Sequence, residues 1–151
     1  MPPLSRRRFW AAAGAAGVGL WTWRVEPHWV EFVRRDLPVR NLPAALDGRT
    51  LAQVSDIHVG PRVDSDYLVA ALRRLSELQP DLVALTGDFV SAVGAERVDE
   101  LARVLEHLPT PPLGVVAVLG NHDYGAGWRN ADVGERVTAR LRDLGVHVLR
   151  N

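Results

Sequence analysis

Three short stretches decide the fold of this 151-residue chain: Ser55-Asp56-Ile57-His58, Gly87-Asp88 and Gly120-Asn121-His122-Asp123. Each follows an apolar run that is short and rich in aliphatic residues, at 51–54, 82–85 and 115–119 respectively. Runs of this kind are typical of strands that are buried on both faces of a parallel sheet. The sequence therefore predicts three strands, each ending in polar residues.

The segments between these strands have helical periodicity. A helix beginning after the capping residue Asp64 and ending before Pro80 is expected, followed by helices over about 96–107 and 132–145. Residues 146–149 then read as a fourth strand. Because strand motifs recur roughly every thirty residues, the length of a βαβ unit, the predicted fold class is α/β.

Parallel α/β sheets bind ligands outside the carboxyl ends of their strands, where all three polar motifs fall. Asp56 and His58 are two apart, so on extended backbone their side chains point to the same side. Oxygen and imidazole donors suit Mn²⁺, Fe²⁺ or Zn²⁺. Each motif alone is more typical of a solvated loop or a turn, but the three in the same structural position favour a metal site.

These residues resemble the calcineurin-like metallophosphoesterase superfamily, whose pattern runs Asp-x-His, Gly-Asp, Gly-Asn-His-Asp or Glu, a lone His and Gly-His-x-His. Residues 51–151 match the first three blocks, together with the flanking Ser55, Gly60, Pro80-Asp81, Thr86 and Tyr124. The resemblance implies a sandwich fold in which helices pack on the sheet. The last two blocks are absent, so only the N-terminal portion of such a domain is expected.

The resemblance also implies a role for each matching residue. Asp56 and His58 would bind a first divalent metal ion, Asp88 would bridge two ions, and Asn121 would bind the second through its amide oxygen. His122 would lie near the leaving-group oxygen as an acid, or donate a hydrogen bond to the phosphoryl group, with Asp123 orienting its ring. Two such ions polarise a phosphoryl group and make a bridging water more acidic, which implies hydrolysis of a phosphodiester or pyrophosphate bond.

The missing histidines would complete both metal sites in full-length relatives, so we expect the chain as written to be an inactive fragment. His28, His107 and His147 have plainer interpretations as residues outside the domain, near a helix end and inside a strand. The alternative function is a membrane-tethered, non-catalytic module that binds a metal or a partner. His122 and Asp123 favour the enzyme, because such a module has little use for an oriented imidazole.

Residues 1–25 resemble a twin-arginine export signal or a membrane anchor. Ser5-Arg6-Arg7-Arg8-Phe9-Trp10 precedes an apolar stretch that runs to about Trp23, with no clean cleavage site after it. We therefore expect an uncleaved anchor at the cytoplasmic membrane, with the domain on the extracytoplasmic side if the export machinery reads the arginine pair. An exported form and attachment at the cytoplasmic face are the alternatives.

The segment before the domain is less regular. Apolar residues between Pro27, Pro38 and Pro43 read as one or two edge strands within residues 26–46. Together with the anchor-like start and Leu51-Ala52-Gln53-Val54-Ser55-Asp56-Ile57-His58, this region resembles bacterial membrane-associated phosphoesterases, among them enzymes that cleave the pyrophosphate of UDP-diacylglucosamine. A phosphorylated small molecule or lipid is the substrate class this implies.

The composition of the chain limits which partners and metal ligands are expected. The formal net charge is zero, with 18 basic and 18 acidic residues, but the four Arg of residues 1–25 leave the remainder mildly acidic. A mildly acidic domain argues against sequence-independent binding to nucleic acid. The chain has no Cys, which excludes disulfides and thiolate metal ligands.

Overall fold

The computed structural model describes residues 5–25, 29–91 and 96–150. The chain divides into two compact units, Met1–Leu37 and Pro38–Asn151, and the second contains the sheet.

The sheet has four parallel strands in the order β1-β2-β3-β4. They are β1 (Leu51–Val54), β2 (Leu82–Leu85), β3 (Val115–Ala117) and β4 (His147–Val148). The register pairs Val54 with Leu85, Leu85 with Ala117, and Ala117 with Val148. The predicted α/β class is confirmed, although β3 and β4 are shorter than expected.

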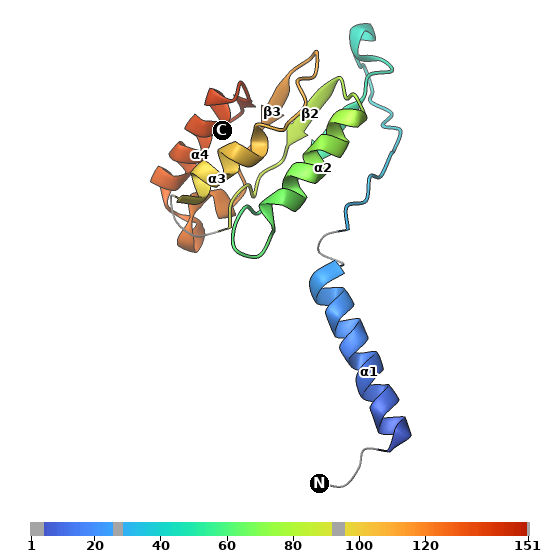
Figure 1. The fold of residues 1–151 in the computed structure, drawn as a ribbon. Helices are drawn as coiled ribbons and strands as arrows, with labels where there is room; N and C mark the ends of the chain where they lie inside the picture. Colours follow the sequence, from blue (N-terminus) through green and yellow to red (C-terminus); the bar gives the residue numbers. More distant parts are fainter. Residues whose placement is uncertain (1–4, 26–28, 92–95, 151) are drawn as a thin grey trace. The chain divides into compact units, whose positions relative to one another are not determined.

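Three helices connect the strands and cover one face of the sheet (Figure 1): α2 (Ser65–Glu77), α3 (Glu96–Leu105) and α4 (Ala131–Asp143). Neighbouring helices contact each other in chain order, as successive right-handed crossovers in one direction require. The Asp64 carboxylate caps α2 by accepting from the backbone N–H of Asp66 at 2.8 Å, as predicted. Asn130 caps α4, which begins one residue earlier than expected.

The core lies between the sheet and this helical layer. Buried strand residues such as Val83 and Leu85 pack against the apolar faces of the helices, which include Leu72, Leu101 and Leu141. The opposite face of the sheet is less covered, since Leu51 is 47% exposed and His147 is also exposed. The packing of the described residues therefore fixes the sheet mainly from the helical side.

The first unit contains α1 (Arg6–Leu20), which continues as a π-helical turn η1 (Trp21–Val25). Ser5 caps α1, and none of the residues of α1 is buried. Among the described residues, no helix combines the length and apolar character needed to cross a bilayer.

The edge strands expected within residues 26–46 are not present in the described part of that segment, and this prediction was wrong. Residues 29–43 have no regular strand or helix, and Ala44–Leu46 form a short 3₁₀ turn, η3. Residues 26–28 lie outside the described part. The aromatic and aliphatic residues suggested strands, but the prolines at 38 and 43 lack the N–H groups that a ladder needs.

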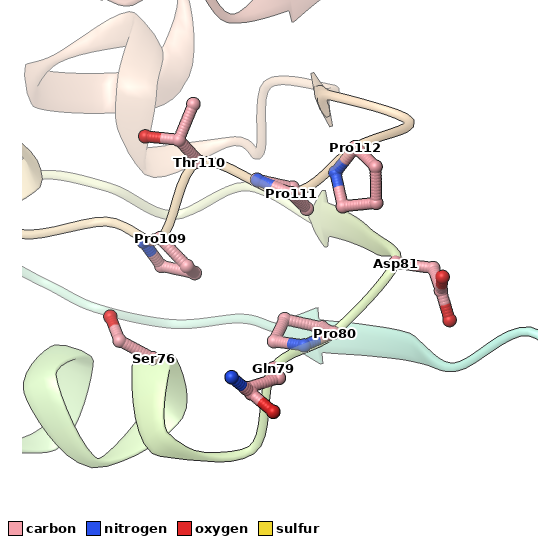
Figure 2. A pocket seen from close by; sticks show the side chains of 8 residues that line it. All are labelled: Ser76, Gln79, Pro80, Asp81, Pro109, Thr110, Pro111 and Pro112. Atoms are coloured by element: carbon pink, nitrogen blue, oxygen red, sulfur yellow. The ribbon is translucent and has the colours of Figure 1, made fainter.

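A hollow lies at the amino ends of β2 and β3, and Figure 2 shows the side chains that line it. It is lined by Ser76, Gln79, Pro80, Asp81, Pro109, Thr110, Pro111 and Pro112. Asp81 is engaged with Arg49, whose Nη1 lies 2.8 Å from Oδ1. Because its lining residues precede β2 and β3, the hollow lies at the amino edge of the sheet, whereas the polar motifs follow the carboxyl ends of the strands.

Candidate metal centre

The segments after β1 and β2 remain hydrogen-bonded beyond the ends of the strands. The backbone N–H of Asp56 donates to the carbonyl of Gly87 at 3.1 Å, and that of His58 donates to the carbonyl of Asp88 at 2.9 Å. Val59 and Val90 then form an isolated parallel bridge. These bonds hold the first two motifs side by side at the carboxyl edge of the sheet.

Three candidate ligands have left-handed backbones. The φ angles are 55° at Asp56, 47° at His58 and 55° at Asp88. The extended backbone assumed for Asp56 and His58 is therefore wrong, although their side chains still meet. Residues other than glycine adopt this conformation uncommonly, although Asp and His do so more often than most, and such residues gather at functional sites.

Two glycines allow the second and third motifs to approach closely. A Cβ at Gly87 would lie 2.4 Å from the backbone nitrogen of Gly120, and a Cβ at Gly120 would lie 2.2 Å from Oδ1 of Asp88. Neither distance is compatible with a side chain. These glycines were part of the predicted motifs, but their packing role was not anticipated.

The candidate ligands converge at this edge. One donor atom from each of His58, Asp88 and His122 lies within 4.8 Å of the others. Nε2 of His58 lies 3.5 Å from Oδ1 of Asp56 and 3.8 Å from Oδ2 of Asp88. Two ligands bonded to one ion at about 2.1 Å in tetrahedral geometry lie about 3.4 Å apart, so the spacing and the carboxylate–imidazole chemistry fit a divalent ion.

His122 lies within this group of donors, whereas sequence reasoning gave it a catalytic role only. Its ring packs edge-to-face against that of His58, with centroids 4.8 Å apart. Its backbone N–H donates to Oδ1 of Asp88 at 3.0 Å. Its Nδ1 is buried and has no hydrogen-bond partner among the described residues, which leaves a polar atom available to a ligand.

Asp123 is fully buried and holds backbone rather than the His122 ring. Its carboxylate accepts from the backbone N–H groups of four residues: Asp88 at 3.0 Å, Phe89 at 2.7 Å, Val90 at 3.2 Å and Gly120 at 2.8 Å. Burial raises the pKa of Asp123, with a smaller contribution from the charge of Asp88, whereas the N–H groups of Gly120, Val90 and Phe89 act in the opposite direction. The expected orientation of the His122 ring by Asp123 is thus replaced by a bond network that joins two strand ends.

The remaining candidates differ in position. Asn121 precedes the 3₁₀ turn η4 (His122–Tyr124) and is exposed, and its side chain makes no capping hydrogen bond. Asp56 is also exposed, at 64% of its side-chain area. His107 follows α3 and His147 lies on β4, so neither belongs to the cluster, while His28 lies outside the described residues.

Sequence reasoning missed Trp128, which closes a second 3₁₀ turn, η5 (Ala126–Trp128). Its ring centroid lies 5.7 Å from that of His122. The position of a tryptophan shortly after the third motif was the available signal.

The chain therefore contains an α/β domain with a parallel sheet. Carboxylates and imidazoles gather at the carboxyl edge of that sheet and form a candidate metal centre. The model of the calcineurin-like phosphoesterase family matches residues 49–147, and the chain belongs to this family.

Several curated proteins are similar to the chain. UDP-2,3-diacylglucosamine pyrophosphatase LpxG of Chlamydia muridarum is 36% identical over 112 residues, covering 73% of the chain and 34% of that protein. A transmembrane protein with metallophosphoesterase domain from Danio rerio is 35% identical, with 77% and 25% covered. The uncharacterized metallophosphoesterase YkuE of Bacillus subtilis is 30% identical, with 83% and 47% covered.

The chain therefore spans about a third of the length of LpxG and about half that of YkuE. None of the solved structures matches it.

Proposed function

We propose that this chain forms the metal-binding edge of a phosphoesterase that hydrolyses a phosphodiester or pyrophosphate bond. The observation that carries the proposal is the convergence of two candidate ligands, His58 and Asp88, with the candidate acid His122, because one donor atom of each lies within 4.8 Å of the others. Each comes from a different strand end, and the family to which the chain belongs is that of calcineurin-like phosphoesterases.

The proposed centre is dinuclear and takes Mn²⁺, Fe²⁺ or Zn²⁺. Asp56 and His58 would hold one ion, Asn121 would contribute to the second, and Asp88 would bridge the two. A carboxylate suits the bridging position because its charge offsets part of the repulsion between two cations. When bound, divalent ions supply Lewis-acid stabilisation of phosphoryl charge and a more acidic water.

His122 is proposed to donate a proton to the leaving-group oxygen. Its backbone N–H is bonded to Asp88, and its ring lies close to those of His58 and Trp128. Asp123 acts through the backbone, because its four hydrogen bonds set the positions of the second and third motifs. This division assigns the proton to His122 and the positioning to Asp123.

The proposed substrate class is a phosphorylated lipid or small molecule, with a glycolipid such as UDP-diacylglucosamine as the leading example. The similarity to LpxG supports this choice, since that protein is named for cleaving UDP-2,3-diacylglucosamine. The attraction for phosphate would come from the metals rather than from a basic surface, because residues 26–151 are mildly acidic.

We further propose that residues 1–25 attach the protein to the cytoplasmic membrane, with the domain on the extracytoplasmic side after twin-arginine export. The support is local: α1 exposes Phe9, Trp10 and Leu20, and arginines occupy its first turn. Apolar and aromatic side chains combined with arginines are typical of segments that enter a membrane interface. Sedimentation with vesicles, comparing the whole protein with one lacking residues 1–25, tests this attachment.

The catalytic proposal is tested by metal removal and restoration. The full-length protein is treated with a chelator and titrated with Mn²⁺, and hydrolysis of bis-(p-nitrophenyl) phosphate is followed. Activity should disappear with the metal and return with it, and Asp88→Asn should not recover. Asp132→Asn, an exposed aspartate on α4, serves as the control. Metal binding without hydrolysis would favour the non-catalytic module instead.

A further inference from the structure

Trp128 presents an indole beside the candidate metal centre. Its side chain is 57% exposed, and its ring centroid lies 5.7 Å from that of His122 at an interplanar angle of 55°. One part of the indole therefore faces the imidazole while much of its surface is open to solvent. A large exposed aromatic side chain next to a candidate reaction centre is a natural contact surface for a ligand.

The backbone around Trp128 fixes this position. Trp128 has a φ of 59°, and Gly127 before it has a φ of 73°. The turn is closed by hydrogen bonds from the N–H of Trp128 to the carbonyl of Gly125 at 2.9 Å and from the N–H of Asn130 to the carbonyl of Tyr124 at 2.8 Å. A bulky residue in the left-handed region is a genuine outlier, and outliers of this kind point to a function.

We infer that Trp128 is a specificity-determining residue that stacks against a planar ring of the substrate, such as a nucleobase. This inference rests on the proposed phosphoesterase function and extends it to the group carried by the phosphoryl. Metal ions held by Asp56, His58 and Asp88 would bind the phosphoryl group whatever it carries. A flat indole instead favours a flat ring over an ordinary sugar or alkyl group, because two flat rings can stack face to face. Such stacking requires only one exposed face of the indole.

The distance is suitable for this role. His122 is proposed to contact the leaving-group oxygen, and the centre of the Trp128 ring lies 5.7 Å from the centre of the His122 ring. A base joined to the phosphoryl through a single ribose spans a comparable gap. An acyl chain would require an extended apolar groove, whereas residues 126–130 next to the indole are exposed and include Arg129 and Asn130.

The test compares two phosphodiesters that differ only in the base: the methyl ester of a nucleoside 5′-monophosphate and the methyl ester of ribose 5-phosphate. Loss of each diester is followed by ³¹P NMR with the Mn²⁺-loaded full-length protein. The readout is the ratio of the two kcat/KM values. Trp128→Leu keeps an apolar side chain without a ring, Trp128→Phe keeps a ring, and Trp29→Leu removes an exposed indole of the other unit.

The wild-type ratio should favour the nucleotide by about tenfold, Trp128→Leu should bring it close to one, and the Phe and Trp29 variants should retain most of it. An unchanged ratio in Trp128→Leu would overturn the inference while leaving the phosphoesterase intact. If the wild type hydrolyses neither diester, the proposed function fails first. If Trp128→Leu does not fold, inhibition of the wild type by the nucleoside 5′-monophosphate and by ribose 5-phosphate tests the preference for a base independently. Equal inhibition by the two would also overturn the inference.

Discussion

The backbone N–H of Asp88 donates to Oδ2 of Asp123 at 3.0 Å, although the two residues are 35 positions apart. The side chain of Asp88 in turn accepts from the backbone N–H of His122 at 3.0 Å. The second and third motifs are thus joined by hydrogen bonds in both directions. Asp123 holds the backbone of Asp88, and the Asp88 carboxylate faces the candidate centre.

Asp123→Ala should lower the free energy of unfolding by at least about 3 kcal/mol, because it leaves four backbone N–H groups without their acceptor in a buried position. Urea unfolding followed by circular dichroism measures this. Asp47→Ala, which removes an exposed aspartate outside the site, should change stability by less than about 0.5 kcal/mol. Equal effects of the two substitutions would show that the Asp123 network contributes little.

Gly120→Ala should displace the Asp88 carboxylate, because the added Cβ would lie 2.2 Å from its Oδ1 and 2.5 Å from its backbone nitrogen. We expect weakened Mn²⁺ binding, measured by titration calorimetry. Gly114→Ala is the matched control: its φ of 85° makes Ala unfavourable, but no atom lies within 4 Å of the added Cβ. Gly114→Ala should therefore lose stability and keep its metal affinity, and a similar affinity loss in both variants would contradict the packing argument.

His122→Ala should lower kcat by about 10²- to 10⁴-fold while metal content is retained, since proton donation acts mainly in the transition state. Metal content and kcat are measured on the same preparation. The structure makes this experiment decisive, because His122 also lies among the candidate ligands. Loss of metal together with activity would identify it as a ligand and refute its assignment as the acid.

A surface aspartate should give the protein part of its acid sensitivity. The backbone N–H of Thr50 and the guanidinium of Arg49 hold the pKa of Asp81 below its ordinary value. The pKa of Asp81 in the folded protein is lower than its unfolded value of about 3.9. Ionised Asp81 therefore stabilises the fold fully at pH values above the unfolded pKa. The contribution is lost as the pH falls through the folded pKa.

Asp81→Asn should therefore lower the urea midpoint at pH 6, and the difference from wild type should shrink towards pH 3. Asp47→Asn, at a site outside this pair, provides the comparison. A difference that stays constant between pH 6 and pH 3 would show that Asp81 acts by a route other than its charge.

The sequence predicted the elements whose signals are local. Apolar runs located β1 and β2, and Asp64 marked the beginning of α2, because caps and periodicity depend on neighbours along the chain. The carboxyl-edge position of the motifs followed from parallel topology. The strand prediction for residues 29–43 was wrong because apolar residues alone do not make a strand. A strand also needs a pairing partner elsewhere in the chain.

The site's internal geometry could not be predicted in the same way. The left-handed backbones at Asp56, His58 and Asp88 are uncommon for residues other than glycine, and they occur where the strand ends are hydrogen-bonded to each other. Asp123 looked like a partner for the adjacent imidazole, yet its acceptors are saturated by N–H groups that are mostly more than thirty residues away. Both features depend on which strand ends become neighbours.

If the cluster at the carboxyl edge binds the metal required for hydrolysis, substituting a histidine inside the cluster should remove that metal, whereas substituting one outside it should not. His58→Ala and His147→Ala are purified with Mn²⁺, desalted and measured by mass spectrometry alongside the wild type. His58 lies in the cluster, whereas His147 is exposed on β4. We predict that His58→Ala loses most of its bound metal and its hydrolysis of bis-(p-nitrophenyl) phosphate, while His147→Ala retains both. Full metal content in His58→Ala, or equal loss in the two variants, would contradict the assignment of this site.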